Sequence, residues 1–287
     1  MSREYDKRCF IFVRLEKSEC LFFDKGDGNV DSGNILFHFS GAYRQQDFYK
    51  GEDIEEIDCE HLYGTNCCLD EKTREWLEKE IAVKGTGGIH FLDSGNYHYM
   101  TRLWMEQIRQ PFDLLVLDHH TDMDFPMLEE LLTCGSWLRN ALEGQENMKE
   151  VYLIGPEQKD VERIGDYHKG KMHIMTQEQM HQGNRPEEAK DGFPIYISID
   201  KDVLGEQWAR TAWTQGDMTL EEMCHILDSF IRKREVLGID ICGEAPRTGN
   251  VAQECLWRNI NEKTNDVLFG FLEDYKRAGF FEKSMVQ

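Results

Sequence analysis

The sequence predicts an α/β fold built on a largely parallel, doubly wound sheet. From residue 85 to residue 278, short apolar runs alternate with segments of helical periodicity, which is typical of parallel strands joined by helices. Residues 114–117 form a continuous apolar run, as expected of a strand buried on both faces. No internal repeat or Pro-rich linker interrupts the chain. We therefore expect one domain over residues 1–287, with residues 1–80 as its divergent N-terminal part.

The individual elements follow from local patterns. Apolar, β-branched and aromatic runs predict strands at 9–14, 20–23, 35–39, 89–92, 114–117, 151–154, 173–175, 195–199 and 236–241, the first two as a hairpin. Amphipathic spacing predicts helices at 70–81, 97–110, 128–142, 176–182, 219–234 and 266–278, the third of them interrupted near residues 134–136. Asp70 is the expected N-cap of the first helix, and Thr219 and Glu222 form a capping box. The acidic residues 51–60 are expected in a solvated loop or helix.

Composition excludes several classes of partner. The chain has 33 Lys and Arg against 54 Asp and Glu, a net charge of −21. Nucleic acids and anionic membranes bind basic surfaces, so neither is an expected partner, whereas a small cationic substrate is favoured. The nine cysteines are an odd number without a C-x-x-C pair, and the N-terminus has no secretory signal pattern. We therefore expect a cytoplasmic protein with reduced thiols.

The chemistry is concentrated where the central strand ends. Asp118, His120 and Asp122 directly follow the apolar run at alternate positions, so in extended backbone their side chains share one face. His119 alternates to the opposite face and is expected to pack behind the ligands. In open α/β sheets, ligands bind at the carboxyl ends of the strands. The pattern therefore indicates a cluster of oxygen and nitrogen donors at one point.

Two further strands contribute to the same edge of the sheet. Asp200 and Asp202 end the strand at 195–199, and His98 lies in the turn and helix that follow the strand at 89–92. Together with the central motif they supply four carboxylates and two imidazoles. Buried without cations, this set would be prohibitively unfavourable, whereas two divalent ions neutralise its −4 charge. Mixed oxygen and nitrogen donors favour Mn²⁺, so we predict two manganese ions per chain and a water activated for hydrolysis.

Three motifs resemble the ureohydrolases, the superfamily of arginase and agmatinase. They are Asp118-His119-His120-Thr121-Asp122, Asp200-Lys201-Asp202 and Gly95-Asn96-Tyr97-His98, and the resemblance covers roughly residues 85–275. It implies a three-layer α/β/α fold, a binuclear manganese site and hydrolysis of a guanidinium C–N bond by a metal-bridging hydroxide. It also implies trimers or hexamers. By resemblance, Asp118 and Asp200 bridge the two ions, His98 and Asp122 complete one site, and His120 and Asp202 complete the other.

The sequence departs from the family's pattern at two positions. Cys134 stands where the family has a proton-shuttling histidine, and Glu244 lies one place later than the glutamate that binds the guanidinium. Both are candidate catalytic residues here. The predicted function is hydrolysis of a guanidino or amidino C–N bond. The departures leave two alternatives open, an amide or deacetylase-like hydrolase and a catalytically silent metal-binding relative.

Overall fold

The computed structural model describes residues 33–125, 131–165, 170–186 and 192–281. The hairpin predicted at 9–14 and 20–23 lies outside these residues. The described residues belong to one compact unit. A single domain over the whole chain therefore stays a prediction, because its N-terminal part is not described.

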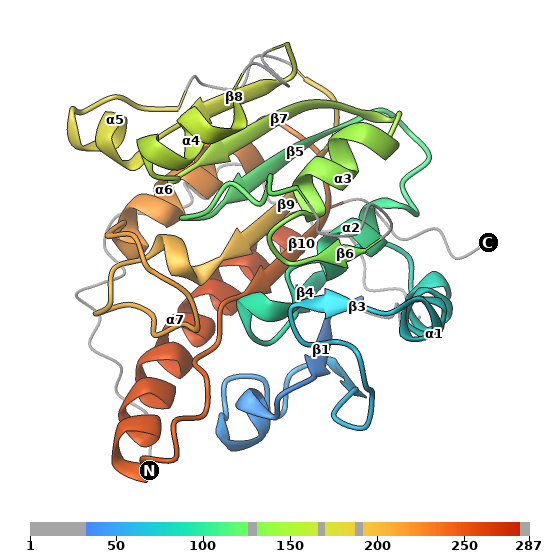
Figure 1. Cartoon of the computed structure of the whole chain (residues 1–287), viewed down its shortest axis with the longest axis vertical. Helices are drawn as coiled ribbons and strands as arrows, with labels where there is room; N and C mark the ends of the chain where they lie inside the picture. The colour runs from blue at the N-terminus through green and yellow to red at the C-terminus, as the bar shows by residue number, and fades with distance from the viewer. Residues whose placement is uncertain (1–32, 126–130, 166–169, 187–191, 282–287) are drawn as a thin grey trace. The chain divides into compact units, whose positions relative to one another are not determined.

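An eight-stranded sheet forms the centre of the molecule, and every paired neighbour in it is parallel (Figure 1). In sheet order the strands are β2 (Glu55–Asp58), β1 (Ile35–His38), β4 (Ile89–Phe91), β10 (Val236–Cys242), β9 (Ile195–Asp200), β5 (Phe112–Leu117), β7 (Met148–Ile154) and β8 (Met172–Met175). A separate antiparallel pair joins β3 (Cys68–Leu69) to β6 (Leu132–Thr133). The predicted parallel α/β sheet is confirmed.

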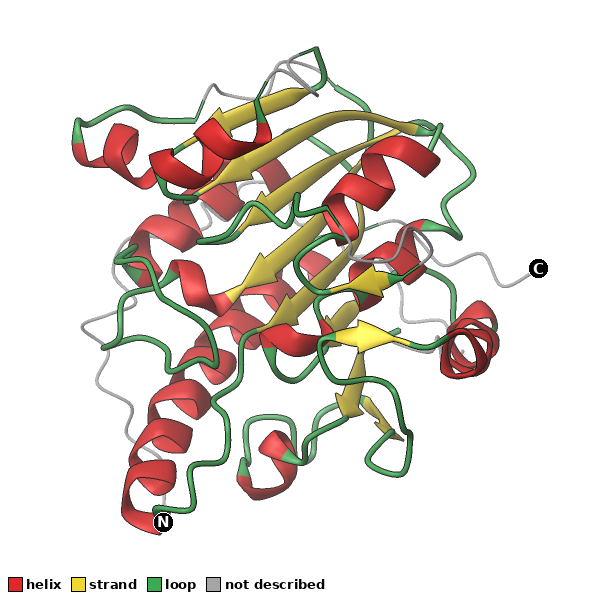
Figure 2. Ribbon diagram, viewed as in Figure 1, coloured by secondary structure: helices red, strands yellow, loops and turns green. Residues whose placement is uncertain are grey.

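Helices cover both faces of this sheet (Figure 2). One face packs against α1 (Glu71–Ala82), α2 (Met100–Met105) and α3 (Trp137–Gly144). The other packs against α6 (Leu220–Ile231) and the C-terminal part of α7 (Val251–Arg277). The shorter elements are α4 (Gln158–Ile164), α5 (Gln177–His181), η1 (Ala42–Gln45), η2 (Gly95–Tyr97) and η3 (Lys201–Val203). The three-layer α/β/α architecture that the resemblance implied is therefore confirmed.

The central strand β5 shows why its sequence is continuously apolar. Leu114 and Val116 pack into the core shared with α1, α2 and α3. Leu115 and Leu117 pack into the core shared with α6 and α7. All four side chains are fully buried. Each contributes about 1.5–3 kcal/mol through removal of apolar surface from water, so β5 is fixed firmly in the middle of the sheet.

The predicted helix starts are confirmed where capping residues marked them. The side chain of Asp70 accepts a hydrogen bond from the Thr73 backbone N–H at the start of α1. Thr219 and Glu222 form the reciprocal capping box at the start of α6. Among the described helices, none combines the length and apolar character needed to cross a bilayer.

Four predictions of local structure were wrong in type or extent. Within the acidic segment 51–60, β2 forms an edge strand, because Ile57 is buried while its charged neighbours remain exposed. The helix predicted at 97–110 is divided between η2 and the short α2. Of the interrupted helix predicted at 128–142, the part after residue 136 is confirmed as α3, whereas residues 132–133 pair with β3 and residues 128–130 lie outside the described part of the chain. The last helix begins at Val251 rather than residue 266, with Asn250 as its N-cap.

The strand order brings distant parts of the sequence to one edge of the sheet. The four neighbouring strands β4, β10, β9 and β5 are parallel, so their carboxyl ends lie side by side. The segments that follow them carry His98, Glu244, the Asp200–Asp202 motif and the Asp118–Asp122 motif. This edge is where the site forms.

Candidate metal centre

His98 is the centre of one half of the site. It is buried at the end of η2, and its Nδ1 lies 3.3 Å from Asp118 Oδ2, 3.0 Å from Asp122 Oδ2 and 3.7 Å from Asp200 Oδ2. Its Nε2 is 2.7 Å from Ser198 Oγ in the neighbouring strand β9. The contact of Nε2 with Ser198 fixes the orientation of the ring, so that Nδ1 is directed toward the three carboxylates.

His120 is the centre of the other half. Its Nδ1 lies 2.8 Å from Asp202 Oδ2 and 3.6 Å from Asp118 Oδ1. Its Nε2 is 2.9 Å from Thr214 Oγ1, and its side chain is 29% exposed. Asp118 therefore lies between the two histidines, with one oxygen toward each. The structure thus brings together all six residues that the sequence predicted as metal ligands.

The backbone holds these carboxylates in fixed positions. Asp200 Oδ1 accepts a hydrogen bond from the Asp202 backbone N–H, which makes Asp200 the N-cap of η3. Asp122 has a positive φ of 49°, an uncommon conformation for a residue with a side chain. Trp137 Nε1 donates to Asp122 Oδ2 at 2.5 Å. The turn at Asp122 and this indole direct its carboxylate back toward His98.

The electrostatics of the cluster reflect crowded negative charge. Burial raises the pKa of Asp122 to about 7, with the charge of Asp118 adding to the effect. Burial and the neighbouring charge of Asp200 raise the pKa of Asp202 well above its usual range. Burial lowers the pKa of His120, but hydrogen bonds with Asp118 and Asp202 outweigh it and raise the pKa to about 12. The cluster therefore favours positive charge at its centre.

The donor set fits divalent cations. Within the described residues, the only cationic groups that pair with these four carboxylates are the two histidines. Donor atoms of His98, Asp118 and Asp122 lie within 4.8 Å of one another, as do those of Asp118, His120 and Asp202. Two groups that share Asp118 and carry oxygen and nitrogen donors match a pair of adjacent ions.

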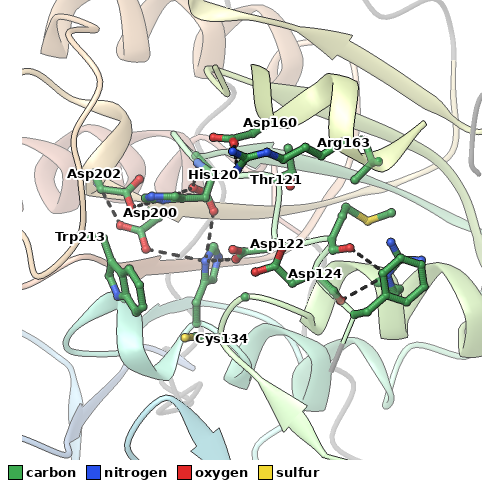
Figure 3. Close-up of a pocket in the computed structure, with 18 residues that line it drawn as sticks. His120, Thr121, Asp122, Asp124, Cys134, Asp160, Arg163, Asp200, Asp202 and Trp213 are labelled. Carbon is green, nitrogen blue, oxygen red and sulfur yellow. Dashed lines mark hydrogen bonds and ion pairs between the residues drawn. The ribbon is translucent and has the colours of Figure 1, made fainter. Parts of the chain in front are cut away.

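A pocket of about 360 Å³ opens onto this cluster (Figure 3). In Figure 3, Trp213 and Cys134 lie on one side of the labelled carboxylates, and Asp160 and Arg163 of α4 lie above them. Arg163 donates a hydrogen bond to Asp160 at 2.8 Å. Trp213 is 43% exposed. The wall of the pocket therefore combines a charged pair with an aromatic surface.

Cys134 lies in the wall of the pocket. It is buried, and burial raises the pKa of its thiol well above the ordinary value. The thiols of Cys134 and Cys67 are hydrogen-bonded to each other. Cys134 is therefore a neutral thiol near neutral pH, which is a weak proton acceptor.

Glu244 is near the site but not in its pocket. Its carboxylate forms a buried ion pair with Lys201, and three side-chain amides donate to it, from Gln46 at 2.9 Å, Asn261 at 3.0 Å and Asn265 at 2.8 Å. Burial raises its pKa, but the charge of Lys201 and the hydrogen bonds from Lys201, Asn265 and Asn261 together outweigh burial and lower it. The structure does not place this carboxylate among the groups that line the pocket.

His119 and Asp124, two neighbours of the candidate ligands, differ in their exposure to the pocket. His119 is buried and does not line the pocket, with its Nε2 3.7 Å from Glu157. Asp124 is exposed and does line the pocket. Asp124 is therefore an unburied acid within reach of a ligand.

Sequence reasoning missed three side chains that contact the candidate ligands. Ser198 and Trp137 hold His98 and Asp122, as described above. Cys242 ends β10 beside Asp200, with its Sγ 3.2 Å from Asp200 Oδ2. Cys242 could have been found as a cysteine at a strand end next to the Asp200 strand. Ser198 and Trp137 carried no comparable signal, because only the fold brings them to the cluster.

Comparisons with known proteins agree with this geometry. Residues 31–255 match the family model described as "Arginase family". An uncharacterized protein of Thermotoga maritima is 35% identical over 210 residues, which cover 73% of this chain and 78% of that protein.

Several solved structures share the fold. Formimidoylglutamase from Bacillus subtilis has a TM-score of 0.63 at 15% identity, covering 94% of this chain and 98% of its own. Agmatine ureohydrolase of Thermoplasma volcanium has a TM-score of 0.57 at 16% identity, covering 88% and 94%. A triple mutant of an arginase-like protein of T. brucei, bound with Mn²⁺, has a TM-score of 0.54 at 17% identity, covering 86% and 92%.

Proposed function

Because this chain belongs to the arginase family, we propose that it is a binuclear metal hydrolase that cleaves a C–N bond of a guanidino or amidino compound. The observation that carries this proposal is the convergence of six donors from three strand ends, with Asp118 between His98 and His120. Buried carboxylates in this number need cations to balance their charge.

Manganese is the proposed metal. The four carboxylates and two imidazoles are the donor types that suit Mn²⁺. One protein of the same fold, the T. brucei arginase-like mutant, carries two introduced aspartates and one introduced histidine and is bound with Mn²⁺. When bound, such ions polarise the substrate and lower the pKa of water so that it becomes a nucleophile near neutral pH.

The chain's own residues would bind and orient the substrate. Asp124, which is exposed in the pocket wall, favours a cationic substrate, in agreement with the net charge of −21. Trp213 offers a partly exposed aromatic surface beside His120, with ring centroids 6.0 Å apart. Cys134 remains a candidate group in the same wall, where its neutral thiol would donate a hydrogen bond to a leaving group rather than accept a proton.

The position of Glu244 favours a second candidate function. Its carboxylate is already occupied by Lys201 and three amides, so it is poorly placed to bind a guanidinium in the pocket. The second candidate is therefore an amide or deacetylase-like hydrolase that uses the same metal cluster. The two functions differ in their products, because a guanidino compound releases urea and an amide releases a carboxylate and an amine.

The proposal is tested by metal content and product analysis together. Purified protein loaded with Mn²⁺ should hold close to two ions per chain by elemental analysis. Asp122→Ala should lose at least one ion. A panel of guanidino and amidino compounds should then yield urea or the corresponding amide, and lose that activity in Asp122→Ala.

The outcomes separate the candidates. Turnover of amides with no urea from any guanidino compound would replace the first function by the second. Two bound ions with no hydrolysis of either class would indicate a silent metal-binding protein. Equal metal content in wild type and Asp122→Ala would contradict the ligand assignment itself.

A further inference from the structure

Cys242 occupies a special position beside the cluster. It ends β10, the strand that lies between β4, which leads to His98, and β9, which ends in Asp200. In the β9–β10 register Cys242 is the direct partner of Asp200. The side chain is fully buried. Its sulfur therefore cannot reach solvent, and the side chain packs on the face of the sheet that α1, α2 and α3 cover.

The contacts of this sulfur are with proposed ligands. Cys242 Sγ lies 3.2 Å from Asp200 Oδ2, and its thiol is also hydrogen-bonded to His98. Donor atoms of His98, Asp200 and Cys242 all lie within 4.8 Å of one another. These three residues thus form a third donor group, which shares His98 with the Asp118 and Asp122 group.

We propose that Cys242 is a ligand of the ion on the His98 side, so that the two metal positions differ in chemistry. This inference rests on the metal centre of the proposed function. The His98 position would combine an imidazole, carboxylates and a thiolate sulfur. The His120 position has an imidazole and carboxylates only.

The observed spacing is compatible with a shared ion. With metal–sulfur and metal–oxygen distances of about 2.3 and 2.0 Å, two donors on one ion lie roughly 3.0–3.5 Å apart. The Cys242 sulfur and the Asp200 oxygen are separated by 3.2 Å. The same distance suits a thiol that only donates a hydrogen bond to Asp200. The experiment must therefore detect a metal–sulfur bond directly.

A sulfur donor would change which metal is preferred. Thiolate favours softer ions such as Zn²⁺ and Co²⁺, whereas carboxylate and imidazole accommodate Mn²⁺. The His98 position should therefore select Zn²⁺ or Co²⁺ over Mn²⁺, while the His120 position should not. A mixed pair of ions is the expected consequence.

Cobalt provides the decisive probe, because Co²⁺ bound to thiolate has a strong near-ultraviolet charge-transfer absorption. Metal-free full-length protein is titrated anaerobically with Co²⁺, with bound cobalt measured in parallel. We expect the band to grow with one equivalent of cobalt per chain. It should be lost in Cys242→Ser and retained in the matched control Cys134→Ser, which changes the other thiol near the ligands.

Competition measurements give a second readout. The ratio of Zn²⁺ to Mn²⁺ affinity should fall about tenfold or more in Cys242→Ser, as expected when a metal contact is lost. Cys242→Ala gives the same comparison if the serine variant does not fold.

Each result has a defined meaning. Two bound cobalt ions without the band would overturn the sulfur ligand and leave the proposed metal centre standing. If the band disappears in Cys134→Ser and persists in Cys242→Ser, the sulfur donor is Cys134, and the inference about Cys242 is overturned. No bound cobalt at all would overturn both this inference and the proposed function.

Discussion

Two buried clusters of charge lie on either side of one tripeptide, Asp200-Lys201-Asp202. The two aspartates face the pocket and join the carboxylate and imidazole cluster. Lys201 is fully buried away from the pocket, where it pairs with Glu244. The side chain of Lys201 thus lies apart from those of its two neighbours, and the tripeptide contributes to two separate buried clusters whose charge is balanced in different ways.

The difference lies in where the balancing charge comes from. The Lys201 and Glu244 pair carries no net charge, and amides satisfy its remaining hydrogen-bonding capacity. The acidic cluster has a surplus of carboxylates, and burial together with neighbouring negative charge raises the pKa values of Asp122, Asp200 and Asp202. Burial also raises the pKa of Asp118, but hydrogen bonds with the two histidines outweigh burial and lower it. The first cluster is complete with residues of the chain alone. The second has more carboxylates than histidines among the described residues, and we propose that added cations complete it.

The largest expected effect comes from breaking the internal pair. Lys201→Met should lower the free energy of unfolding by about 3–5 kcal/mol, because the Glu244 carboxylate is left buried without its cation. Lys201→Met combined with Glu244→Gln should recover most of this loss. Urea denaturation of the single and double variants in the presence of a chelator measures both. A double variant no more stable than Lys201→Met would show that the pair does not act as a unit.

In the acidic cluster, removing a charge should stabilise the protein, whereas removing the Lys201 charge destabilises it. In the presence of a chelator, Asp122→Asn should raise the free energy of unfolding by about 1 kcal/mol or more. Burial and the charge of Asp118 already disfavour the ionised form there, and each unit of pKa shift corresponds to about 1.4 kcal/mol. The asparagine oxygen can still accept the hydrogen bond from Trp137.

With Mn²⁺ bound, Asp122→Asn should lower the free energy of unfolding instead of raising it. Saturating Mn²⁺ at about 100 times its dissociation constant stabilises the wild type by about 2.7 kcal/mol per site, and Asp122→Asn should lose most of the gain at one site. Thermal unfolding with and without Mn²⁺ makes the comparison. If Asp122→Asn were less stable than wild type even in chelator, the carboxylate would be stabilising by itself and the comparison of the two clusters would fail.

A smaller effect is expected at Asp93, a buried carboxylate outside both clusters. Among the described residues no cation pairs with it, but Phe39, Ser40 and Ser94 backbone N–H groups and the Ser40 hydroxyl donate to it. Burial raises its pKa to about 6, with the Ser40 hydrogen bonds opposing the rise. The folded protein therefore binds this proton more tightly than the unfolded chain, whose value is about 3.9.

The sign of the pH dependence follows from that difference. The contribution of Asp93 to stability is fully present below about pH 4 and is lost as the pH rises through 6. Asp93→Asn should flatten this slope between pH 4 and 6, although it lowers stability overall because backbone N–H groups lose an acceptor. Unfolding at several pH values in chelator measures the slope. An unchanged slope would assign the titration to another group.

The sequence by itself predicted the parallel sheet and the six candidate metal ligands that lie together at its edge. A strand such as β5, apolar at every position, has to be buried on both faces, and that requirement is local to the strand. The polar residues that follow it have to lie at the sheet edge. Asp118, His120, Asp122, Asp200, Asp202 and His98 were found in this way. Edge strand β2 and the start of α7 were missed, because weakly buried segments lack a strong local pattern.

Only the tertiary structure decided what surrounds the ligands. The spacing of Glu244 along the chain did not reveal that its carboxylate pairs with Lys201, which is 43 residues away. The contact of Cys242 with Asp200 depends on β10 lying directly beside β9, and strand order is a property of the whole sheet. Local pattern records which residues must be buried or exposed. Which buried residue meets which is set by packing between elements distant in sequence.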